Sequence, residues 1–242
     1  MIIRSFEIKI KARKPKHPLD SFAVISASSY KGTMKSRCTT FLYHKAMLCL
    51  VLSGLLVACS SQPQLPKLSA HAVILAFGDS LTYGTGAPRG QAYPAVLAKL
   101  SGFTVVNAGV PGEVTSKGLA RLPQVLEDEQ PELLILCHGG NDLIRKTGEQ
   151  QTAANLRAMV SLAQQQGIAV ILVAVPRPTV VLSEPEFYVQ IAEEFNITIL
   201  SGVLPKILRK PSMKSDLIHP NNQGYQFLAK SLYELLMEAN AI

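Results

Sequence analysis

The chain has 242 residues, a length typical of one domain, and a formal net charge of +7. The positive charge is confined to the N-terminal part. Residues 1–58 contain 10 Lys and Arg against 2 Asp and Glu, whereas residues 59–242 contain 14 against 15. A nucleic-acid-binding protein needs a basic surface on its folded domain. We therefore expect no nucleic-acid partner.

The N-terminal part has the features of a targeting segment. Residues 46–58 form an apolar run, preceded by basic residues, that is shorter than the ~20 residues needed to cross a bilayer. This pattern is typical of a signal peptide, predicted here over residues 34–58 with Met34 as its start. Residues 1–33 are basic and lack apolar periodicity, so we expect a mis-called or disordered extension there.

The apolar run ends in Leu56-Val57-Ala58-Cys59, which resembles the lipobox of bacterial lipoproteins. In that family the cysteine is lipidated and becomes the new N-terminus. The resemblance implies a lipid anchor at Cys59 and a location on the periplasmic face of the bacterial envelope, at the outer or inner membrane. A short hydrophobic helix with a chance cysteine is the alternative. Residues 59–70, rich in Ser, Pro and Gln, are predicted to be a tether to a domain over residues 71–242.

The other three cysteines do not indicate a disulfide bond or a metal site. Cys38 and Cys49 lie in the targeting segment, and Cys137 lies in an apolar run where a small core residue is expected rather than a reactive thiol. The spacing fits neither a disulfide framework nor a zinc site.

Beyond the tether, apolar runs of strand length alternate with helical patterns. The runs are continuous rather than alternating in polarity, as expected of strands buried on both faces of a parallel sheet. Strand–helix alternation predicts an α/β layered domain. The predicted strands are residues 72–77, 104–107, 133–137, 169–174 and 197–200, and the predicted helices are residues 92–100, 117–128, 149–166, 186–195 and 222–238.

The first predicted strand leads directly into Gly78-Asp79-Ser80-Leu81, at the end of the sheet where ligand sites form. A serine hydroxyl becomes a good nucleophile once a base takes its proton. A strand-to-helix turn also points backbone N–H groups at incoming negative charge. Taken alone, the motif fits a helix cap as well as it fits a nucleophile, and the surrounding Gly, Ser and Thr residues also allow a phosphate-binding loop. The Gly-x-Ser-x-Gly elbow of α/β-hydrolases is absent.

Two more polar turns follow the second and third predicted strands. Residues 107–113 contain two glycines and a proline, which predict a tight turn whose backbone N–H can approach a substrate oxygen. Gly139-Gly140-Asn141-Asp142 offers a side-chain amide that can donate to an oxyanion. An ordinary turn and a helix start are the respective alternatives.

The segment Asp216-Leu217-Ile218-His219-Pro220 precedes the last predicted helix. Histidine is the usual general base at neutral pH, and a carboxylate can hold it in the required tautomer. A proline-started helix with Asp216 on the surface is the alternative. His71 lies at the wrong end of the sheet. His138 lies at the correct end but lacks an acidic residue on its own loop, so His219 is the preferred base.

Together, the four segments resemble the GDSL, or SGNH, hydrolase superfamily, named for the Ser, Gly, Asn and His of its four blocks. The resemblance extends over residues 72–220. It is strongest to the bacterial thioesterase I/lysophospholipase/arylesterase group, which shares Gly-Asp-Ser-Leu, Gly-Gly-Asn-Asp and Asp-x-x-His-Pro. That group is usually soluble in the periplasm, and it usually has Ser-Gly-Asp/Glu-Thr where this chain has Pro111-Gly112-Glu113-Val114.

The resemblance implies a flavodoxin-like three-layer sandwich with a five-stranded parallel sheet. It further implies a serine esterase that hydrolyses carboxylic esters or thioesters through an acyl-enzyme on Ser80, with Asp216 and His219 completing the triad. The N–H groups of Ser80 and Gly112 and the Asn141 amide would form the oxyanion hole.

No metal or other cofactor is implied by the resemblance. We expect a monomer acting on a small acyl ester or lipid-like substrate, with residues 176–188 bordering the acyl site. A polysaccharide O-acetylesterase of the cell envelope and a non-catalytic ligand-binding lipoprotein are the alternative hypotheses.

Overall fold

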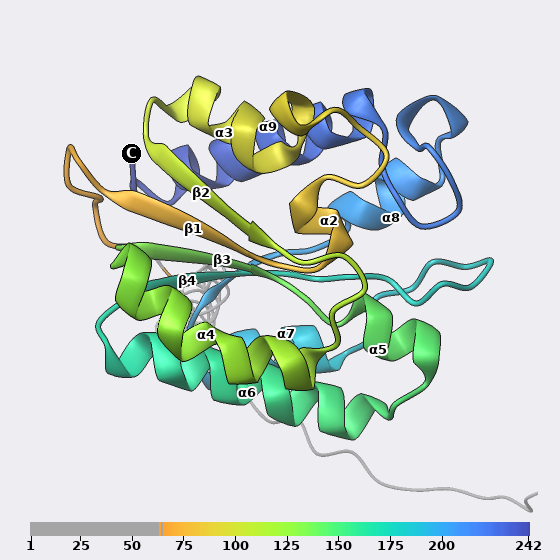
Figure 1. Ribbon diagram of the computed structural model, residues 1–242, viewed down its shortest axis with the longest axis horizontal. Coiled ribbons are helices and arrows are strands. Elements are labelled where there is room, and N and C mark those ends of the chain that lie inside the picture. Colours follow the sequence, from red (N-terminus) through yellow and green to blue (C-terminus); the bar gives the residue numbers. More distant parts are fainter. Residues whose placement is uncertain (1–62, 64) are drawn as a thin grey trace, which may run out of the picture. The chain divides into compact units, whose positions relative to one another are not determined.

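The computed structural model describes residue 63 and residues 65–242, so the predicted targeting segments and Cys59 lie outside the described residues. The described part contains a five-stranded, all-parallel sheet in the order β2-β1-β3-β4-β5, with helices on both faces (Figure 1). This is the doubly wound, flavodoxin-like order, in which the winding direction reverses between β1 and β3. The predicted fold class is confirmed.

All five predicted strands and all five predicted helices are present, with ends shifted by at most two residues. The strands are β1 (Val73–Gly78), β2 (Thr104–Gly109), β3 (Leu133–Cys137), β4 (Ala169–Val173) and β5 (Thr198–Leu200). The longer helices are α3 (Tyr93–Ser101), α4 (Thr115–Glu129), α6 (Glu149–Gln165), α7 (Phe187–Glu194) and α9 (Asn222–Glu238).

Several short helices were not predicted, because helices of one or two turns show no apolar periodicity. They are α2 (Ser80–Tyr83), α5 (Gly140–Arg145) and α8 (Val203–Leu208), together with the 3₁₀ turns η1 (Arg89–Gln91) and η2 (Pro211–Met213). Two of them, α2 and α5, directly follow β1 and β3 at the carboxyl edge of the sheet.

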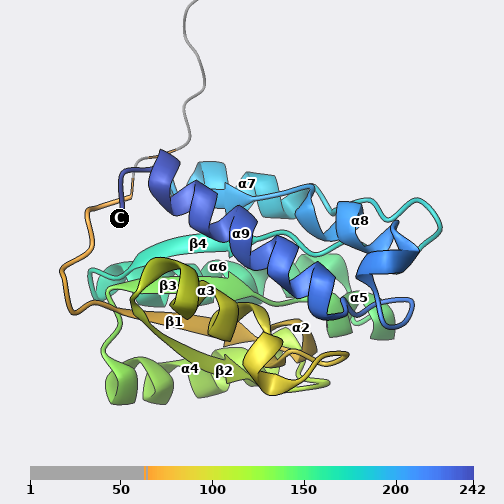
Figure 2. The same ribbon diagram turned by 90° about the horizontal axis from the view of Figure 1, so that it is seen from above.

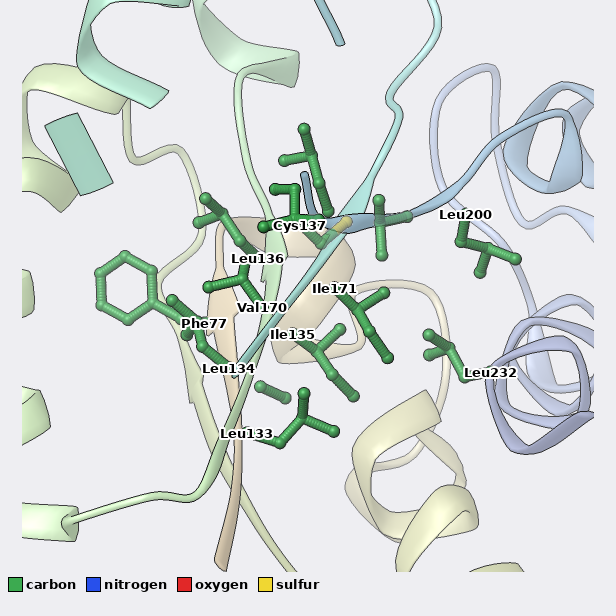
Figure 3. Close-up of a cluster of buried hydrophobic side chains, with 14 of the residues drawn as sticks. Phe77, Leu133, Leu134, Ile135, Leu136, Cys137, Val170, Ile171, Leu200 and Leu232 are labelled. Carbon is green, nitrogen blue, oxygen red and sulfur yellow. The ribbon is translucent and has the colours of Figure 1, made fainter. Parts of the chain in front are cut away.

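The helices form two layers with the sheet between them. Helices α3 and α9 pack together on one face, and α4, α6 and α7 cover the other (Figures 1 and 2). The core centres on β1, β3 and β4, and Figure 3 shows buried side chains of these strands together with Leu232 of α9. Every residue of β3 is buried, including Cys137, which is a core residue as predicted.

Strand β2 differs from the expectation that all strands are buried on both faces. Its residues are partly or fully exposed, because β2 is an edge strand with a neighbour only on the β1 side. A continuous apolar run therefore identified the strand correctly but not its position in the sheet.

Part of the predicted tether packs against the domain. Leu65 and Leu68 are buried, the Leu68 N–H donates to the Ala241 carbonyl at 2.8 Å, and the Thr198 hydroxyl donates to the Pro63 carbonyl at 2.9 Å. The contact between Pro63 and Thr198 lies at the amino end of β5, opposite the carboxyl edge of the sheet. Among the described helices, none has the length and apolar character needed to cross a membrane.

Candidate active site

Ser80 is the first residue of α2 and follows β1 after a single capping residue. Asp79 is that cap, and its Oδ1 accepts a hydrogen bond from the Leu81 N–H at 3.0 Å. Gly78 allows the turn to pass close to β3, because a β-carbon there would lie 2.0 Å from the Cys137 carbonyl oxygen. The packing of β1 against β3 thus fixes where the Ser80 hydroxyl emerges.

The structure brings Ser80, His219 and Asp216 together as a hydrogen-bonded chain. His219 Nε2 lies 3.0 Å from Ser80 Oγ, and His219 Nδ1 lies 2.7 Å from Asp216 Oδ2. The N–H groups of Ile218 and His219 both donate to Asp216 Oδ1 at 2.8 Å. One short loop therefore supplies both the histidine and the carboxylate that orients it.

The electrostatics of the hydrogen-bonded row Ser80–His219–Asp216 favour one arrangement of protons. Partial burial opposes ionisation of Asp216, but the donors from Ile218 and His219 outweigh it and hold the pKa of Asp216 below its ordinary value. An ionised carboxylate accepts the Nδ1–H of a neutral histidine. His219 Nε2 is then unprotonated and can accept the proton of the Ser80 hydroxyl.

The loop that carries His219 is fixed at both ends. The Ser215 N–H donates to the His219 carbonyl at 3.0 Å, closing the loop on itself. Asn221 caps α9 through the Gly224 N–H, and its amide donates to the carbonyls of Ser212 and Lys214. The sequence analysis did not single out Asn221, although asparagine after proline at a helix start is a recognisable capping signal.

Asn141 lies in the first turn of α5 and is held by two acceptors. Its Nδ2 donates to Asp79 Oδ2 at 3.1 Å and to the Glu113 carbonyl oxygen at 3.0 Å. A side-chain amide has two N–H bonds, so both are engaged. Asp79, which is buried, therefore links the Ser80 turn to Asn141.

Gly112 lies in a turn from Val110 to Glu113 that is closed by the Glu113 N–H and the Val110 carbonyl at 3.1 Å. Pro111 and Gly112 are its central residues, and Gly112 has a φ of +78°, a conformation that favours glycine. Arg145 Nη2 donates to the Gly112 carbonyl at 2.9 Å. Within the described part of the chain, the N–H groups of Gly112 and Ser80 make no hydrogen bond.

An open cavity with about 430 Å³ of empty space lies beside the Ser80 hydroxyl. Ser80, Asn141 and His219 line it, whereas Gly112 does not. Its other walls are mostly apolar and include part of the segment 176–188, as the sequence analysis expected. The apolar lining residues are Leu81, Ile144, Val175, Pro176, Pro178, Leu182, Leu208 and Ile218.

His138, the rival base, is fully buried and is bound by a different set of groups. The Gly139 N–H donates to His138 Nδ1 at 3.0 Å, so Nε2 carries the proton and donates to Glu113 Oε2 at 3.2 Å. The acidic residue that the His138 loop lacks is thus supplied by the turn after β2. Among the described residues, His138 makes no contact with Ser80.

Glu113, whose side chain is 7% exposed, is paired with the partly exposed Arg121, a partner not identified from the sequence. Arg121 donates from Nε to Glu113 Oε1 at 3.0 Å and from Nη2 to Oε2 at 2.8 Å. Its guanidinium also lies 4.1 Å from the centre of the Phe77 ring and donates to the Ala108 carbonyl. No local pattern predicts these pairings, because Arg121 approaches from the second turn of α4 and His138 directly follows β3.

The pKa values of the Asp79 and Glu113 carboxyls are shifted in opposite directions by their surroundings. Burial raises the pKa of Asp79, and the hydrogen bonds from the Leu81 N–H and the Asn141 amide do not cancel this effect. Burial also opposes ionisation of Glu113, but the His138 and Arg121 hydrogen bonds lower the pKa of Glu113 from 4.5 to about 2. Glu113 is therefore the firmly ionised member of the two.

Comparison with known proteins shows which family and which relatives the sequence matches. The sequence matches the GDSL-like Lipase/Acylhydrolase family over residues 76–227. It is 31% identical over 171 residues to "Thioesterase 1/protease 1/lysophospholipase L1" of Escherichia coli strain K12, covering 67% of this chain and 82% of that protein. It is 28% identical to an "Arylesterase" of Vibrio mimicus, covering 68% of this chain and 88% of that protein.

Solved structures show the same relationship. The crystal structure of TesA superposes with a TM-score of 0.63 at 27% identity, covering 69% of this chain and 99% of that one. AlinE4, described as an SGNH-hydrolase family esterase, superposes with a TM-score of 0.54 at 28% identity, covering 72% and 98%.

The lowered pKa of Glu113 makes its contribution to stability depend on pH. A carboxylate with a depressed folded-state pKa stabilises the fold above its ordinary pKa, and this stabilisation is lost as the pH falls through about 2. A Glu113→Gln variant has no such titration. The free energy of unfolding of this variant is compared with that of the wild type by urea denaturation. We expect the difference between the two to shrink by about 2 kcal/mol as the pH falls from about 5 to about 3. A difference that stays constant over this range would contradict the assignment.

Proposed function

The chain belongs to the GDSL-like lipase/acylhydrolase family and is a serine ester hydrolase, and we propose that Ser80, His219 and Asp216 are its catalytic triad. One observation carries the proposal: the unbroken hydrogen-bonded chain from Ser80 Oγ through both nitrogens of His219 to Asp216 Oδ2, at 3.0 and 2.7 Å. All three residues come from one chain, so the proposed triad needs no residue from a second subunit.

The proposed reaction is acyl transfer from the substrate to water in two steps. His219 Nε2 takes the Ser80 proton while Oγ attacks the carbonyl carbon of the substrate and forms a tetrahedral oxyanion. His219 then gives that proton to the departing alcohol or thiol, leaving an acyl group on Ser80. In the second step, His219 takes a proton from water, whose oxygen attacks the acyl carbon, and then returns the proton to Ser80 Oγ as the acid leaves. Asp216 remains ionised throughout and stabilises the protonated ring.

We assign the oxyanion hole to the N–H groups of Ser80 and Gly112 and to the Asn141 amide. Two observations support the assignment. Among the described residues, both N–H groups are without an acceptor, and Asn141 lines the same cavity as Ser80. Donors fixed before the reaction stabilise developing charge without reorganising. Gly112 has the weaker support, because it does not line the cavity.

The walls of the cavity support a substrate with an apolar acyl group. Apolar side chains of Ile144, Pro178, Leu208 and Ile218 surround the space beside Ser80. Burying a methylene group there would contribute about 0.8 kcal/mol. A short- to medium-chain carboxylic ester, thioester or lysophospholipid fits such walls better than an O-acetylated polysaccharide, whose sugar ring is polar.

A substrate series tests this choice. We expect kcat/KM to rise with acyl length over the first few carbons of p-nitrophenyl esters and acyl thioesters, by up to about fourfold per methylene. An O-acetylated polysaccharide should be a poor substrate by comparison. Faster release of acetate from the polysaccharide than from any acyl ester would favour the O-acetylesterase alternative.

The assignment of Ser80 is tested with a fluorophosphonate probe, which reacts covalently with activated serines. We expect Ser80→Ala to abolish both probe labelling and ester hydrolysis while leaving the fold intact by circular dichroism. Ser201→Ala is a suitable control, because Ser201 is exposed at the same edge of the sheet and makes no side-chain hydrogen bond within the described chain. Labelling that survives Ser80→Ala would refute the nucleophile.

We also propose that the mature enzyme is a lipoprotein of the bacterial envelope, anchored by lipid at Cys59. The lipobox-like Leu56-Val57-Ala58-Cys59 after an apolar run supports this proposal. In cells fed an alkyne-tagged fatty acid, Cys59→Ala should lose both incorporation of the tag and lipid anchoring. Cys49→Ala, which changes a cysteine inside the apolar run, should keep both. Equal tagging of the two variants would contradict anchoring at Cys59.

A further inference from the structure

The side-chain amide of Asn141 can adopt only one orientation in its surroundings. Its two hydrogen-bond partners, Asp79 Oδ2 and the Glu113 carbonyl oxygen, are both acceptors at 3.0–3.1 Å from Nδ2. Rotating the amide by 180° would bring its own oxygen against both of them and lose both bonds. The N–H groups of Asn141 are therefore fixed by groups outside the triad.

Asp79 couples this orientation to the nucleophile. Its Oδ1 accepts from the Leu81 N–H at the start of α2, and its Oδ2 accepts from Asn141. The carboxylate is 1% exposed, so water does not compete effectively for these bonds. Gly140 leaves room for the contact, because a β-carbon there would lie 3.3 Å from Asp79 Oδ2. The helix that carries Ser80 and the side chain of Asn141 are thus held by one carboxylate.

Glu113 holds Asn141 from the other side through its backbone. The position of its carbonyl depends on the turn, and the Glu113 side chain fixes that turn. Arg121 binds both carboxylate oxygens from α4, while His138 donates from the end of β3. Side-chain exposure of His138 and Glu113 is 0% and 7%, so the contact is shielded from solvent. His138 thus has a role in the fold of the site, although the triad does not use it.

We propose that Asp79 and Glu113 are positioning residues that aim the Asn141 amide at the oxyanion, Asp79 through its carboxylate and Glu113 through its backbone carbonyl. This inference rests on the proposed role of Asn141 as an oxyanion donor. The Asn141 amide can serve the oxyanion although both of its N–H bonds are already engaged. A neutral substrate carbonyl competes weakly for an engaged N–H, whereas an oxyanion is a much stronger acceptor and can share it. The Asn141 contribution therefore appears mainly in the transition state and affects kcat rather than KM.

Replacing Asp79 by its amide tests the proposal directly. In Asp79→Asn the new side-chain oxygen must accept from the Leu81 N–H, so the new NH₂ faces Asn141 and two donors oppose each other. We expect kcat to fall toward the value for Asn141→Ala, a loss of ~10²–10³. KM for a short ester should change by less than about twofold, because the interactions that bind the substrate and the transition state equally are unchanged. Labelling by the fluorophosphonate should slow with kcat.

A double-mutant cycle separates positioning through Asn141 from an independent effect of Asp79. If Asp79 acts through Asn141, adding Asp79→Asn to Asn141→Ala should lower kcat by less than about twofold further, because the side chain that Asp79 positions is already absent. A further loss as large as the one that Asp79→Asn causes alone would show that Asp79 acts independently of Asn141, and would overturn its positioning role.

The proposed role of Glu113 is tested by replacing His138, which donates a hydrogen bond to its carboxylate. A glutamine at this position can still donate an N–H to the Glu113 carboxylate, whereas leucine cannot. We expect His138→Leu to lower kcat by about tenfold, roughly the effect of one lost hydrogen bond to a charged group, and His138→Gln to restore part of that loss. Glu194→Gln is the control, because Glu194 of α7 is paired with Arg157 of α6 and has no hydrogen bond to Asn141. It should leave kcat unchanged.

Failure of this inference and failure of the proposed function give different results. Wild-type turnover by Asn141→Ala would remove Asn141 from the oxyanion hole and refute the proposed function at that residue. A slow Asn141→Ala together with a folded Asp79→Asn of normal kcat would overturn the positioning role of Asp79 alone. Equal kcat for His138→Leu and the wild type would likewise overturn the role of Glu113, and this holds even if Asp79→Asn does not fold.

Discussion

The active site depends on the adjacency of β1 and β3 at the centre of the sheet. Because these strands are hydrogen-bonded neighbours, the turns that follow them emerge side by side, and Gly78 lets them approach closely. The Ser80 turn and the Asn141 turn can then share the Asp79 carboxylate. The turn after β2, with Glu113, closes the arrangement from the edge of the sheet. Only His219 and Asp216 come from a loop outside this strand set, and their loop is fixed by the Asn221 cap of α9. The sheet order thus determines which polar groups can meet.

Three carboxylates in this region have distinct environments and therefore distinct tasks. Asp216 is half-exposed and lies against His219, whose ring it orients. Glu113 is buried beside Arg121 and His138, and the lowered pKa of this carboxyl keeps it ionised as a fixed support. Asp79 is buried without a salt-bridge partner in the described chain, and its hydrogen bonds come from neutral groups. Burial without a compensating cation is energetically costly, which raises the pKa of Asp79. That the fold retains such a group next to Ser80 is consistent with a functional rather than a stabilising role.

The sequence was sufficient to predict the features that local patterns encode. Continuous apolar runs located all five strands, and the polar turns after β1 and β3 identified Ser80 and Asn141, which line one cavity. Long-range pairings were beyond such reasoning. Glu113 and His138 are separated by 25 residues, and their contact exists only because β2 and β3 flank β1. The same limit explains why β2 was expected to be buried and why the packing of Leu65 and Leu68 was not foreseen. The engaged state of the Asn141 amide likewise depends on two partners from different turns.

The proposed oxyanion hole combines two kinds of donor, and this combination separates binding from catalysis. The N–H groups of Ser80 and Gly112 are unengaged within the described chain and can meet a carbonyl as soon as the substrate binds. The Asn141 amide is already satisfied by Asp79 and Glu113, so a neutral carbonyl gains little from it. Only a full negative charge competes well for its N–H bonds, which makes this donor selective for the transition state. Substrate affinity then comes from these two backbone N–H groups and from the apolar cavity walls. Such a division allows the acyl pocket to vary without disturbing the donors that lower the barrier.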